Sequence, residues 1–466
     1  MDWRKQSLEN LEIWDKEYVW HPFTQMQQYR NEETPIIERG EGSYLFDTKG
    51  RKYLDGISSL WVTTHGHCCR EINEAIQAQL NKISHSTLLG LANVPSILLA
   101  KKLVEITPQG LTKVFYSDSG ATAVEIALKI AFQYWCQARG GGNKEKQKFV
   151  YLDNSYHGDT VGSVSVGGID LFHRLYKPLL FDGYKVPSPY CYRCPMGKEK
   201  GSCGMACLEP LEELLAARGR EIASLIIEPL VQGAAGMITS PPGYLKRVRE
   251  ICTSYNVLMI ADEVAVGFGR TGKMFACEEE GVAPDIMCLA KGITGGYLPL
   301  GATLTTDEIF EAFLGSHEEQ KTFYHGHTYT GNPLAGAAAL ANLEIFDKKQ
   351  VITGLQPKIE LLTKGLATFY ALPWVGEIRQ KGMMIGIELV QNKATKEPFP
   401  FALNIGHRVT LEARKRGLIT RPLGNVIVLM PILSMSEEEL TEVLDITYTS
   451  IKAVCADIVG KGLVTG

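Results

Sequence analysis

Short apolar segments alternate with helical ones through the middle of the chain, between about residues 80 and 335. The apolar segments are 114–117, 149–153, 224–228, 257–261 and 286–290. Strands that are apolar on both faces are typical of a parallel sheet covered by helices on both sides. One such helix is predicted over 121–135, where apolar residues recur at helical spacing: Val124, Ala127, Leu128, Ala131, Phe132 and Trp135. We therefore predict an α/β fold built on a mostly parallel sheet.

The two ends of the chain have a different pattern. Residues 40–55 predict a small antiparallel meander with a turn at Gly42. After about residue 340, a helix is followed by strands at 383–389 and 426–430 and by a terminal helix from Ser436, which is an α+β pattern. We expect three parts, namely an N-terminal segment that joins the small domain, a large domain that holds the ligand site, and a C-terminal small domain. Their expected limits are 1–80, 81–335 and 336–466.

Two of the predicted strands lead into charged residues. Strand 286–290 runs into Lys291, and strand 257–261 runs into Asp262. Parallel strands place their carboxyl ends at one edge, where open α/β sheets bind ligands. A single strand-end lysine is more often solvated, and an Asp-Glu pair is often a metal ligand pair or a helix cap. A desolvated lysine, however, readily forms a Schiff base, and pyridoxal 5'-phosphate requires both a lysine for its aldehyde and an acid for its ring nitrogen.

Other residues fit such a cofactor and its substrate. Backbone amides between Ser117 and Thr122, where a strand leads into a helix, are placed for a phosphate at the positive helix end. Tyr156 follows a strand and is placed to stack on a pyridine ring, and Thr328 offers a hydroxyl from a polar turn. Arg421 is suited to hold a carboxylate by two parallel hydrogen bonds. Taken singly, these residues have simpler explanations: a helix start, a loop tyrosine, a capping turn and a salt-bridged surface arginine.

Composition is that of an ordinary soluble globular protein. The chain has 466 residues, 45% hydrophobic and 21% charged, with a net charge of −4. That balance gives no electrostatic reason to expect nucleic-acid binding. No apolar run approaches the ~18 residues of a membrane span, and the N-terminus lacks the apolar core of a signal peptide. Eleven cysteines, mostly in apolar or helical context, favour a reducing cytoplasm.

Four of the cysteines are clustered, at positions 191, 194, 203 and 207. The first two have the two-residue gap of a zinc knuckle, but the second two have a three-residue gap. The segment around them is rich in glycine. Structural zinc remains an alternative, but we expect free thiols in a surface insertion and no metal.

The segment Asp262–Gly272, with Ala283-Pro-Asp285 and Lys291-Gly292, resembles the signature of the class III aminotransferases of fold type I. The resemblance covers nearly the whole chain, and the signature is highly specific. Within that class, Trp20–Met26 is similar to the N-terminal block of the 7,8-diaminopelargonate synthases of biotin biosynthesis. Segments 55–61, 156–159, 325–328 and 421–424 agree with that subfamily. The resemblance implies a homodimer with active sites at the interface, and conversion of the ketone of 8-amino-7-oxononanoate to an amine.

Roles for individual residues follow from the resemblance. It implies that Lys291 forms the Schiff base and carries protons, that Asp262 pairs with the pyridinium nitrogen, and that Tyr156 stacks on the ring. It also implies cofactor contacts from Gly120, Ala121 and His327, and from Thr328 of the partner subunit. Substrate contacts are implied for Arg421, which holds the carboxylate, and for Gly326, Phe23, Leu60 and Trp61. Arg270 and Asp159 are nearby polar positions, of which Arg270 is expected to be structural.

The residues of the donor pocket depart from the pattern of the S-adenosylmethionine-dependent members. Members that use S-adenosylmethionine have a Tyr where Phe23 stands, a Trp where Leu60 stands, and often a Tyr where Val428 stands. Three groups of the donor pocket are therefore missing, and lysine becomes the expected donor, with S-adenosylmethionine as the alternative. Other interpretations are a different ω-amino acid or diamine:2-oxo acid aminotransferase, an aminomutase, and a binding protein without catalysis.

Overall fold

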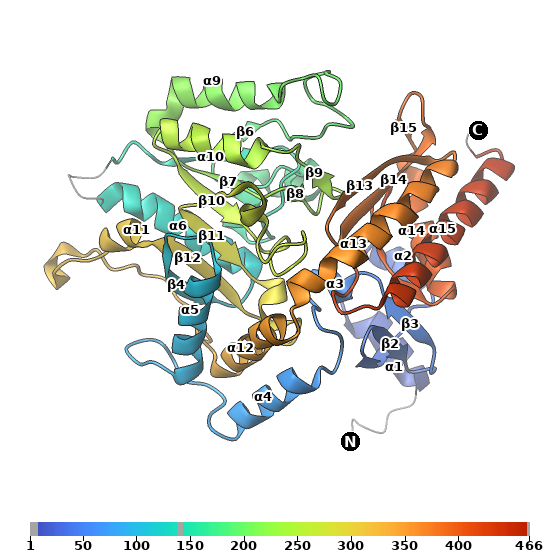
Figure 1. Ribbon diagram of the computed structural model, residues 1–466, viewed down its shortest axis with the longest axis horizontal. Helices are drawn as coiled ribbons and strands as arrows, with labels where there is room; N and C mark the ends of the chain where they lie inside the picture. The colour runs from blue at the N-terminus through green and yellow to red at the C-terminus, as the bar shows by residue number, and fades with distance from the viewer. Residues whose placement is uncertain (1–7, 138–142, 464–466) are drawn as a thin grey trace.

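The computed structural model describes residues 8–137 and 143–463 (Figure 1). Its largest sheet has seven strands in the order β4-β12-β11-β10-β7-β5-β6. These are β4 (Leu111–Ser117), β5 (Lys148–Leu152), β6 (Tyr184–Val186), β7 (Ile222–Ile227), β10 (Leu258–Asp262), β11 (Ile286–Leu289) and β12 (Gly301–Thr306). All neighbouring pairs are parallel except the two that β12 forms, with β4 and β11. The mostly parallel sheet predicted from the apolar segments is confirmed.

Helices cover both faces of this sheet, which explains why its central strands β7, β10 and β11 are buried along almost their whole length. On one face, α6 (Gly120–Gln137) forms a buried core with isoleucines of the strands. On the other face, α10 (Tyr244–Ser254) shares a core with strand residues such as Leu225 and Met259. The predicted helix over 121–135 is therefore present. Its predicted buried face was wrong at Phe132, which is 39% exposed because it lies at the margin of the apolar stripe.

A second sheet lies in the C-terminal part of the chain, in the order β13-β14-β18-β17, with β15 paired to β14. Its strands are β13 (Val375–Lys381), β14 (Met384–Asn392), β15 (Glu397–Pro398), β17 (Arg421–Leu423) and β18 (Val426–Leu429). The accompanying helices are α13 (Val351–Ala367), α14 (Ile405–Lys415) and α15 (Glu437–Gly460). The last helix begins as predicted, because Ser436 forms a capping box with Glu439.

The N-terminal meander joins this C-terminal part. It comprises β1 (Ile37–Glu41), β2 (Tyr44–Asp47) and β3 (Lys52–Asp55), and β16 (Leu418–Ile419) pairs in parallel with β3. In Figure 1 the blue N-terminal strands accordingly lie beside the red C-terminal helices. This pairing brings the two ends of the chain together, and the division into domains with its limits stays a prediction.

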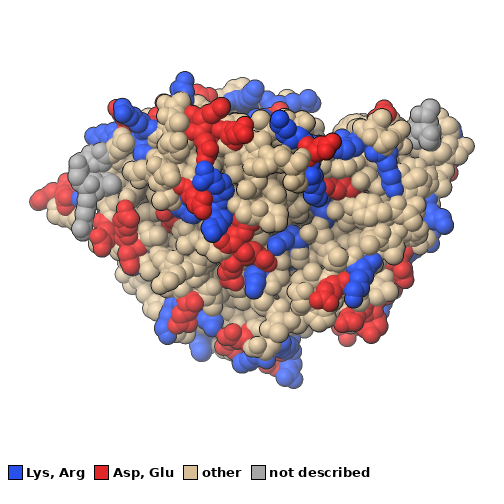
Figure 2. All heavy atoms as spheres, turned by 45° about the horizontal axis from the view of Figure 1, so that its top comes forward, with Lys and Arg blue, Asp and Glu red and all other residues tan. Residues whose placement is uncertain are grey.

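The remaining elements connect these sheets. They are α1 (Leu8–Tyr18), α2 (Met26–Arg30), α3 (Ser58–Trp61), α4 (Arg70–Leu80), α5 (Val94–Ile106), α7 (Val161–Ser165), α8 (Asp170–His173), α9 (Glu209–Arg218), α11 (Asp307–Glu311), α12 (Pro333–Lys348) and the hairpin β8 (Val231–Gln232) and β9 (Ile238–Thr239). Within the described ranges, no helix is long and apolar enough to cross a membrane. On the face drawn in Figure 2, basic and acidic side chains are interspersed, in keeping with the small net charge.

Candidate active site

A cavity of about 740 Å³ lies at the carboxyl edge of the seven-stranded sheet. Residues that follow the ends of β4, β5, β10 and β11 line it, as expected for an open α/β sheet. Many of the residues singled out in the sequence meet here: Phe23, Leu60, Trp61, Gly120, Ala121, Tyr156, Asp159, Asp262, Lys291 and Arg421. The strand-end pattern therefore located the cavity correctly.

Lys291 begins a short 3-10 helix (Lys291–Thr294) directly after β11, with a φ of +46°. A left-handed φ is strained for a non-glycine residue and is frequent at functional sites. Asn342 holds this turn by hydrogen bonds of 3.0 and 3.1 Å from its Nδ2 to two carbonyls. Burial lowers the pKa of the Lys291 amine, although the charge of Asp262 opposes that shift. Lys291 is thus a desolvated amine in the cavity and not a solvated surface lysine.

Asp262 ends β10 and is 4% exposed. Its Oδ2 lies 2.6 Å from Nδ1 of His157, and its Oδ1 accepts a hydrogen bond of 3.1 Å from the amide of Val264. These two contacts fix the orientation of the carboxylate. No sequence pattern assigned a role to His157, which directly follows Tyr156. A histidine beside another candidate, just after a strand, was the signal that could have identified it.

Glu228 is a second buried acid of the cavity. It accepts hydrogen bonds from the amides of Tyr156, at 3.0 Å, and Gly233, at 2.9 Å. Burial raises the pKa of Glu228 to about 7. Glu228 ends the apolar segment 224–228, so the same strand-end signal that points to Asp262 also points to it, although no role was predicted for it.

Tyr156 is held both at its hydroxyl and at its backbone amide. Its hydroxyl donates a hydrogen bond of 2.6 Å to Asp159, and its amide donates to Glu228. Burial, together with the bond to Asp159, raises the pKa of the phenol well above its usual value. The ring is therefore neutral and held in place at the wall of the cavity.

The positive end of α6 meets the cavity at Gly120 and Ala121. The first amides of a helix have no partner within it, and the helix dipole favours an anion there. A Cβ on Gly120 would lie 2.5 Å from Cγ1 of Val264, so only glycine fits without displacing that side chain. An 18-residue helix that begins at the cavity in this way suits a phosphate group.

Arg421, on β17, brings a positive charge into the cavity. Its guanidinium carbon lies 5.7 Å from the centre of the Phe23 ring. Burial lowers the pKa of Arg421. Among the described residues, no Asp or Glu forms an ion pair with it. The alternative of a salt-bridged surface arginine is therefore wrong, and the guanidinium is available to a carboxylate.

A run of left-handed backbone carries two of the cavity side chains. The φ angle is positive from Ser58 to Trp61 and reaches +103° at Leu60. Trp61 is nearly buried, its ring centre lies 4.9 Å from Nζ of Lys291, and its Nε1 has no hydrogen-bond partner within the described residues. Strained backbone of this kind persists only where the surrounding structure holds it, and it is common at ligand sites.

Phe172 also lines the cavity and was not singled out in the sequence. Its ring centre lies 5.3 Å from that of Phe23 and 6.3 Å from that of Tyr156, both in edge-on contact. The three rings form an apolar wall next to Arg421. The short helix α8 that carries Phe172 has only four residues, too few for a periodic signal.

Three of the candidates do not line the cavity of their own chain. Gly326 and Thr328 are exposed, in the loop that precedes α12. Nδ1 of His327 lies 2.7 Å from Oδ2 of Asp118, which does line the cavity. The contact expected from Thr328 of the partner subunit stays a prediction.

Two further residues considered in the sequence do not line the cavity. Val428, which the resemblance placed in the donor pocket, is fully buried in β18 as part of the hydrophobic core and does not line the cavity. Arg270 is also fully buried, and its guanidinium donates to the carbonyls of Pro431, at 2.8 Å, and Thr63, at 2.9 Å. It ties separate segments together, which agrees with a structural role.

The cysteine cluster lies elsewhere. Cys191, Cys194, Cys203 and Cys207 line a separate small cavity of about 20 Å³, and none of them is in a disulfide. In the ranges that the structure describes, no three His, Cys, Asp or Glu side chains are placed to hold a metal ion. The absence of a bound metal stays a prediction.

Comparison with known proteins identifies the family. The model of the family "Aminotransferase class-III" matches residues 26–451. An adenosylmethionine-8-amino-7-oxononanoate aminotransferase of Geobacter sulfurreducens is 54% identical over 447 residues, which are 96% of this chain and 98% of that protein.

Solved structures agree with this match. The crystal structure of the adenosylmethionine-8-amino-7-oxononanoate aminotransferase of Methanocaldococcus jannaschii superposes with a TM-score of 0.91 at 52% identity, covering 96% of this chain and 99% of that one. A PLP-bound amine transaminase from an uncultivated Pseudomonas species has a TM-score of 0.88 at 37% identity, covering 94% and 98%. The amine, the acid and the helix end of the cavity fit this cofactor. The chain therefore belongs to the class III aminotransferases, enzymes of fold type I whose cofactor is pyridoxal 5'-phosphate.

Proposed function

We propose that this aminotransferase converts the ketone of 8-amino-7-oxononanoate to the amine of 7,8-diaminononanoate in biotin biosynthesis. The observation that carries the proposal is the half-buried Arg421, which has no acidic partner among the described residues and lies beside the aromatic wall of Phe23, Phe172 and Tyr156. A long apolar chain that ends in a carboxylate matches an apolar wall next to a free guanidinium. Relatives with half or more of their residues identical carry the corresponding names.

We propose that Lys291, Asp262 and Tyr156 hold the ring and the aldehyde of the cofactor, and that Gly120 and Ala121 hold its phosphate. When bound, pyridoxal 5'-phosphate supplies an electron sink for the electron pair that remains after loss of the substrate's α proton. Asp262 would keep a proton on the ring nitrogen of the bound cofactor, a contact worth about 4 kcal/mol for charges ~4 Å apart at an effective dielectric near 20. His157 and Val264 hold that carboxylate in one orientation.

Lys291 also moves the proton. Its lowered pKa leaves a larger share of the amine unprotonated, so Nζ accepts the α proton and returns it. Trp61 lies against Nζ and limits the entry of water on that side. Tyr156, held by Asp159 and Glu228, would stack on one face of the cofactor ring and keep it in place.

We propose lysine as the amino donor. Phe23 lacks a hydroxyl and Leu60 lacks an aromatic face, and both line the cavity. A cation gains ~0.5–2 kcal/mol from an aromatic face, so the sulfonium of S-adenosylmethionine loses part of its binding here. Because Val428 is not in the cavity, the argument depends on these two positions alone. Lysine presents a carboxylate to Arg421, so one guanidinium serves both half-reactions.

We further propose a cytoplasmic homodimer in which Gly326, His327 and Thr328 complete the neighbouring site. The exposure of Gly326 and Thr328 in a single chain supports this assignment. So does a strip of exposed apolar side chains that includes Leu89, Leu91 and Val94. Eleven cysteines without a disulfide suit a reducing compartment. We also propose domain limits near residues 80 and 335.

The test is a two-step assay of the holoenzyme. Lysine is added first, the excess is removed, and 8-amino-7-oxononanoate is then supplied in a single turnover. Formation of 7,8-diaminononanoate by mass spectrometry is the expected result. Turnover of other ω-amino acids or diamines with 2-oxo acids, without amination of 8-amino-7-oxononanoate, would instead support a general ω-aminotransferase.

A further inference from the structure

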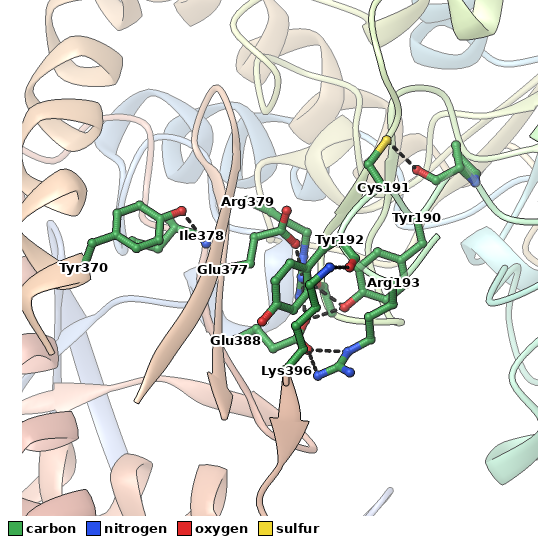
Figure 3. Close-up of polar contacts among 12 residues, drawn as sticks. Tyr190, Cys191, Tyr192, Arg193, Tyr370, Glu377, Ile378, Arg379, Glu388 and Lys396 are labelled. Atoms are coloured by element: carbon green, nitrogen blue, oxygen red, sulfur yellow. Dashed lines mark hydrogen bonds and ion pairs between the residues drawn. The ribbon is translucent and has the colours of Figure 1, made fainter. Parts of the chain in front are cut away.

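Arg379, on β13, is the centre of a buried ionic network at the contact between the C-terminal sheet and the segment that carries the cysteines (Figure 3). The residue is 4% exposed. Its Nη1 donates to Glu388, at 2.5 Å, to Glu377, at 2.8 Å, and to the hydroxyl of Tyr190, at 3.0 Å. A buried arginine with this many partners is satisfied and rigidly held.

Glu388, on β14, joins Arg379 to the cysteine-bearing segment. It accepts a hydrogen bond from the hydroxyl of Tyr190 and a bond of 2.7 Å from Nε of Arg193. Burial alone would raise the pKa of Glu388, but Arg379, Tyr190 and Arg193 together hold it below its usual value. Arg193 therefore belongs to the same network as Arg379, from the opposite side of Glu388.

The other two nitrogens of the Arg379 guanidinium contact the turn between β8 and β9. Its Nε and Nη2 both donate to the carbonyl of Gly236, at 3.0 and 2.8 Å. Gly236 lies in the turn between β8 and β9, with a φ of +103°. A Cβ on Gly236 would lie 3.0 Å from Cγ2 of Val426, and a Cβ on Gly386 would lie 2.7 Å from the Gly236 carbonyl oxygen. The turn is thus seated closely on the C-terminal sheet.

The other side of this turn is a wall of the active-site cavity. Ala234 lines the cavity, and the amide of Gly233 donates to Glu228. A Cβ on Gly233 would lie 3.1 Å from the ring of Trp61, whose centre is 4.9 Å from Nζ of Lys291. A shift of the turn therefore reaches both the buried acid and the ring beside the reactive amine.

We propose that Arg379 is a positioning residue, which holds turn 233–236 against the C-terminal sheet and thereby sets the cavity wall beside Lys291. The guanidinium is suited to this task because two of its N–H groups meet one carbonyl while a third nitrogen stays bound to the acids. A lysine at the same position keeps the charge but cannot make both contacts. Arg193 shares Glu388 but does not contact the turn, which makes it a matched control.

The experiment compares Arg379→Lys with Arg193→Lys. In the cofactor-free proteins, hydrogen–deuterium exchange is measured for peptides that cover 228–240. In the loaded proteins, the pH midpoint of the cofactor absorbance is measured. Arg379→Lys is expected to speed exchange in the turn by about tenfold or more and to shift the midpoint by about 0.5 pH unit or more. Arg193→Lys is expected to leave both close to wild type.

Neither measurement depends on which ketone the enzyme accepts. If the two variants alter both quantities alike, or if Arg379→Lys alters neither, the positioning role is wrong. If Arg379→Lys does not fold, Gly236→Ala decides, because it disturbs the turn while leaving Arg379 and its acids in place. Faster exchange and a shifted midpoint in Gly236→Ala support the proposal, whereas a wild-type midpoint overturns it.

Discussion

Nδ1 of His157 lies 2.6 Å from Oδ2 of Asp262, and both side chains are buried. The imidazole therefore orients the carboxylate assigned to the ring nitrogen of the cofactor. Asp262→Asn should keep the fold but lower kcat by about a thousandfold, since the ring loses its charge partner and several kcal/mol of stabilisation. His157→Phe should cost about tenfold, roughly one charged hydrogen bond. Steady-state kinetics would contradict this if Asp262→Asn turned over at a near-normal rate.

Lys291 should be the lysine that becomes covalently attached to the cofactor. Its amine is desolvated in the cavity, whereas Lys101 is exposed on α5. Reduction of the holoenzyme with borohydride and peptide mapping should place the pyridoxyl group on Lys291. Lys101→Ala is the control and should retain the yellow absorbance near ~420 nm. A label on any other lysine would refute the assignment.

Arg421 should act mainly on the substrate carboxylate. Arg421→Ala should lower kcat/KM for 8-amino-7-oxononanoate by more than about tenfold, which corresponds to the ~1.5–3 kcal/mol of a charged hydrogen bond. Arg416→Ala removes a surface arginine of the same part of the chain that is paired with Glu412, and it should leave kcat/KM unchanged. If both variants had the same kcat/KM, Arg421 would have only a structural role.

The raised pKa of Glu228 predicts a specific dependence of the protein's stability on pH. Its pKa in the fold is about 7, above the usual value of 4.5. A carboxyl with a raised pKa contributes its stability fully below the unfolded value and loses it as the pH rises toward the folded value. Glu228→Gln abolishes that titration.

The Tm difference, variant minus wild type, should therefore become more favourable to Glu228→Gln from about pH 5 to about pH 8. Thermal melts of the cofactor-free proteins at constant ionic strength provide the measurement. Glu250→Gln changes a surface acid that pairs with Arg247, and serves as the control. A Tm difference for Glu228→Gln that stays constant over this range would show that the acid is not titrating there.

Lysine should convert the yellow holoenzyme to the pyridoxamine form faster than S-adenosylmethionine does at equal concentration. The reason is the absence of the hydroxyl at Phe23 and of an aromatic ring at Leu60. Stopped-flow spectra measure both rates. Phe23→Tyr combined with Leu60→Trp should raise the rate with S-adenosylmethionine. A faster reaction of the unmodified enzyme with S-adenosylmethionine would mean that other residues of the cavity bind the sulfonium.

The sequence by itself determined the α/β class, five strands of the seven-stranded sheet (β4, β5, β7, β10 and β11) and the strand ends that carry Asp262 and Lys291. These features depend on local signals, because apolar runs and helical periodicity arise from burial within one element. The sequence also predicted the start of α15, because the capping box of Ser436 and Glu439 involves residues only three positions apart.

Only the tertiary structure decided which distant groups meet. His157 and Asp262 are 105 residues apart, and the Arg379–Gly236 contact spans 143 residues. Strand order and register determine such pairs, and neither is encoded in a local pattern. The same reason applies to Val428, because its place in the core and not in the cavity depends on how β18 packs. Chemistry at a strand end is visible in the sequence, whereas the partners that orient it depend on packing.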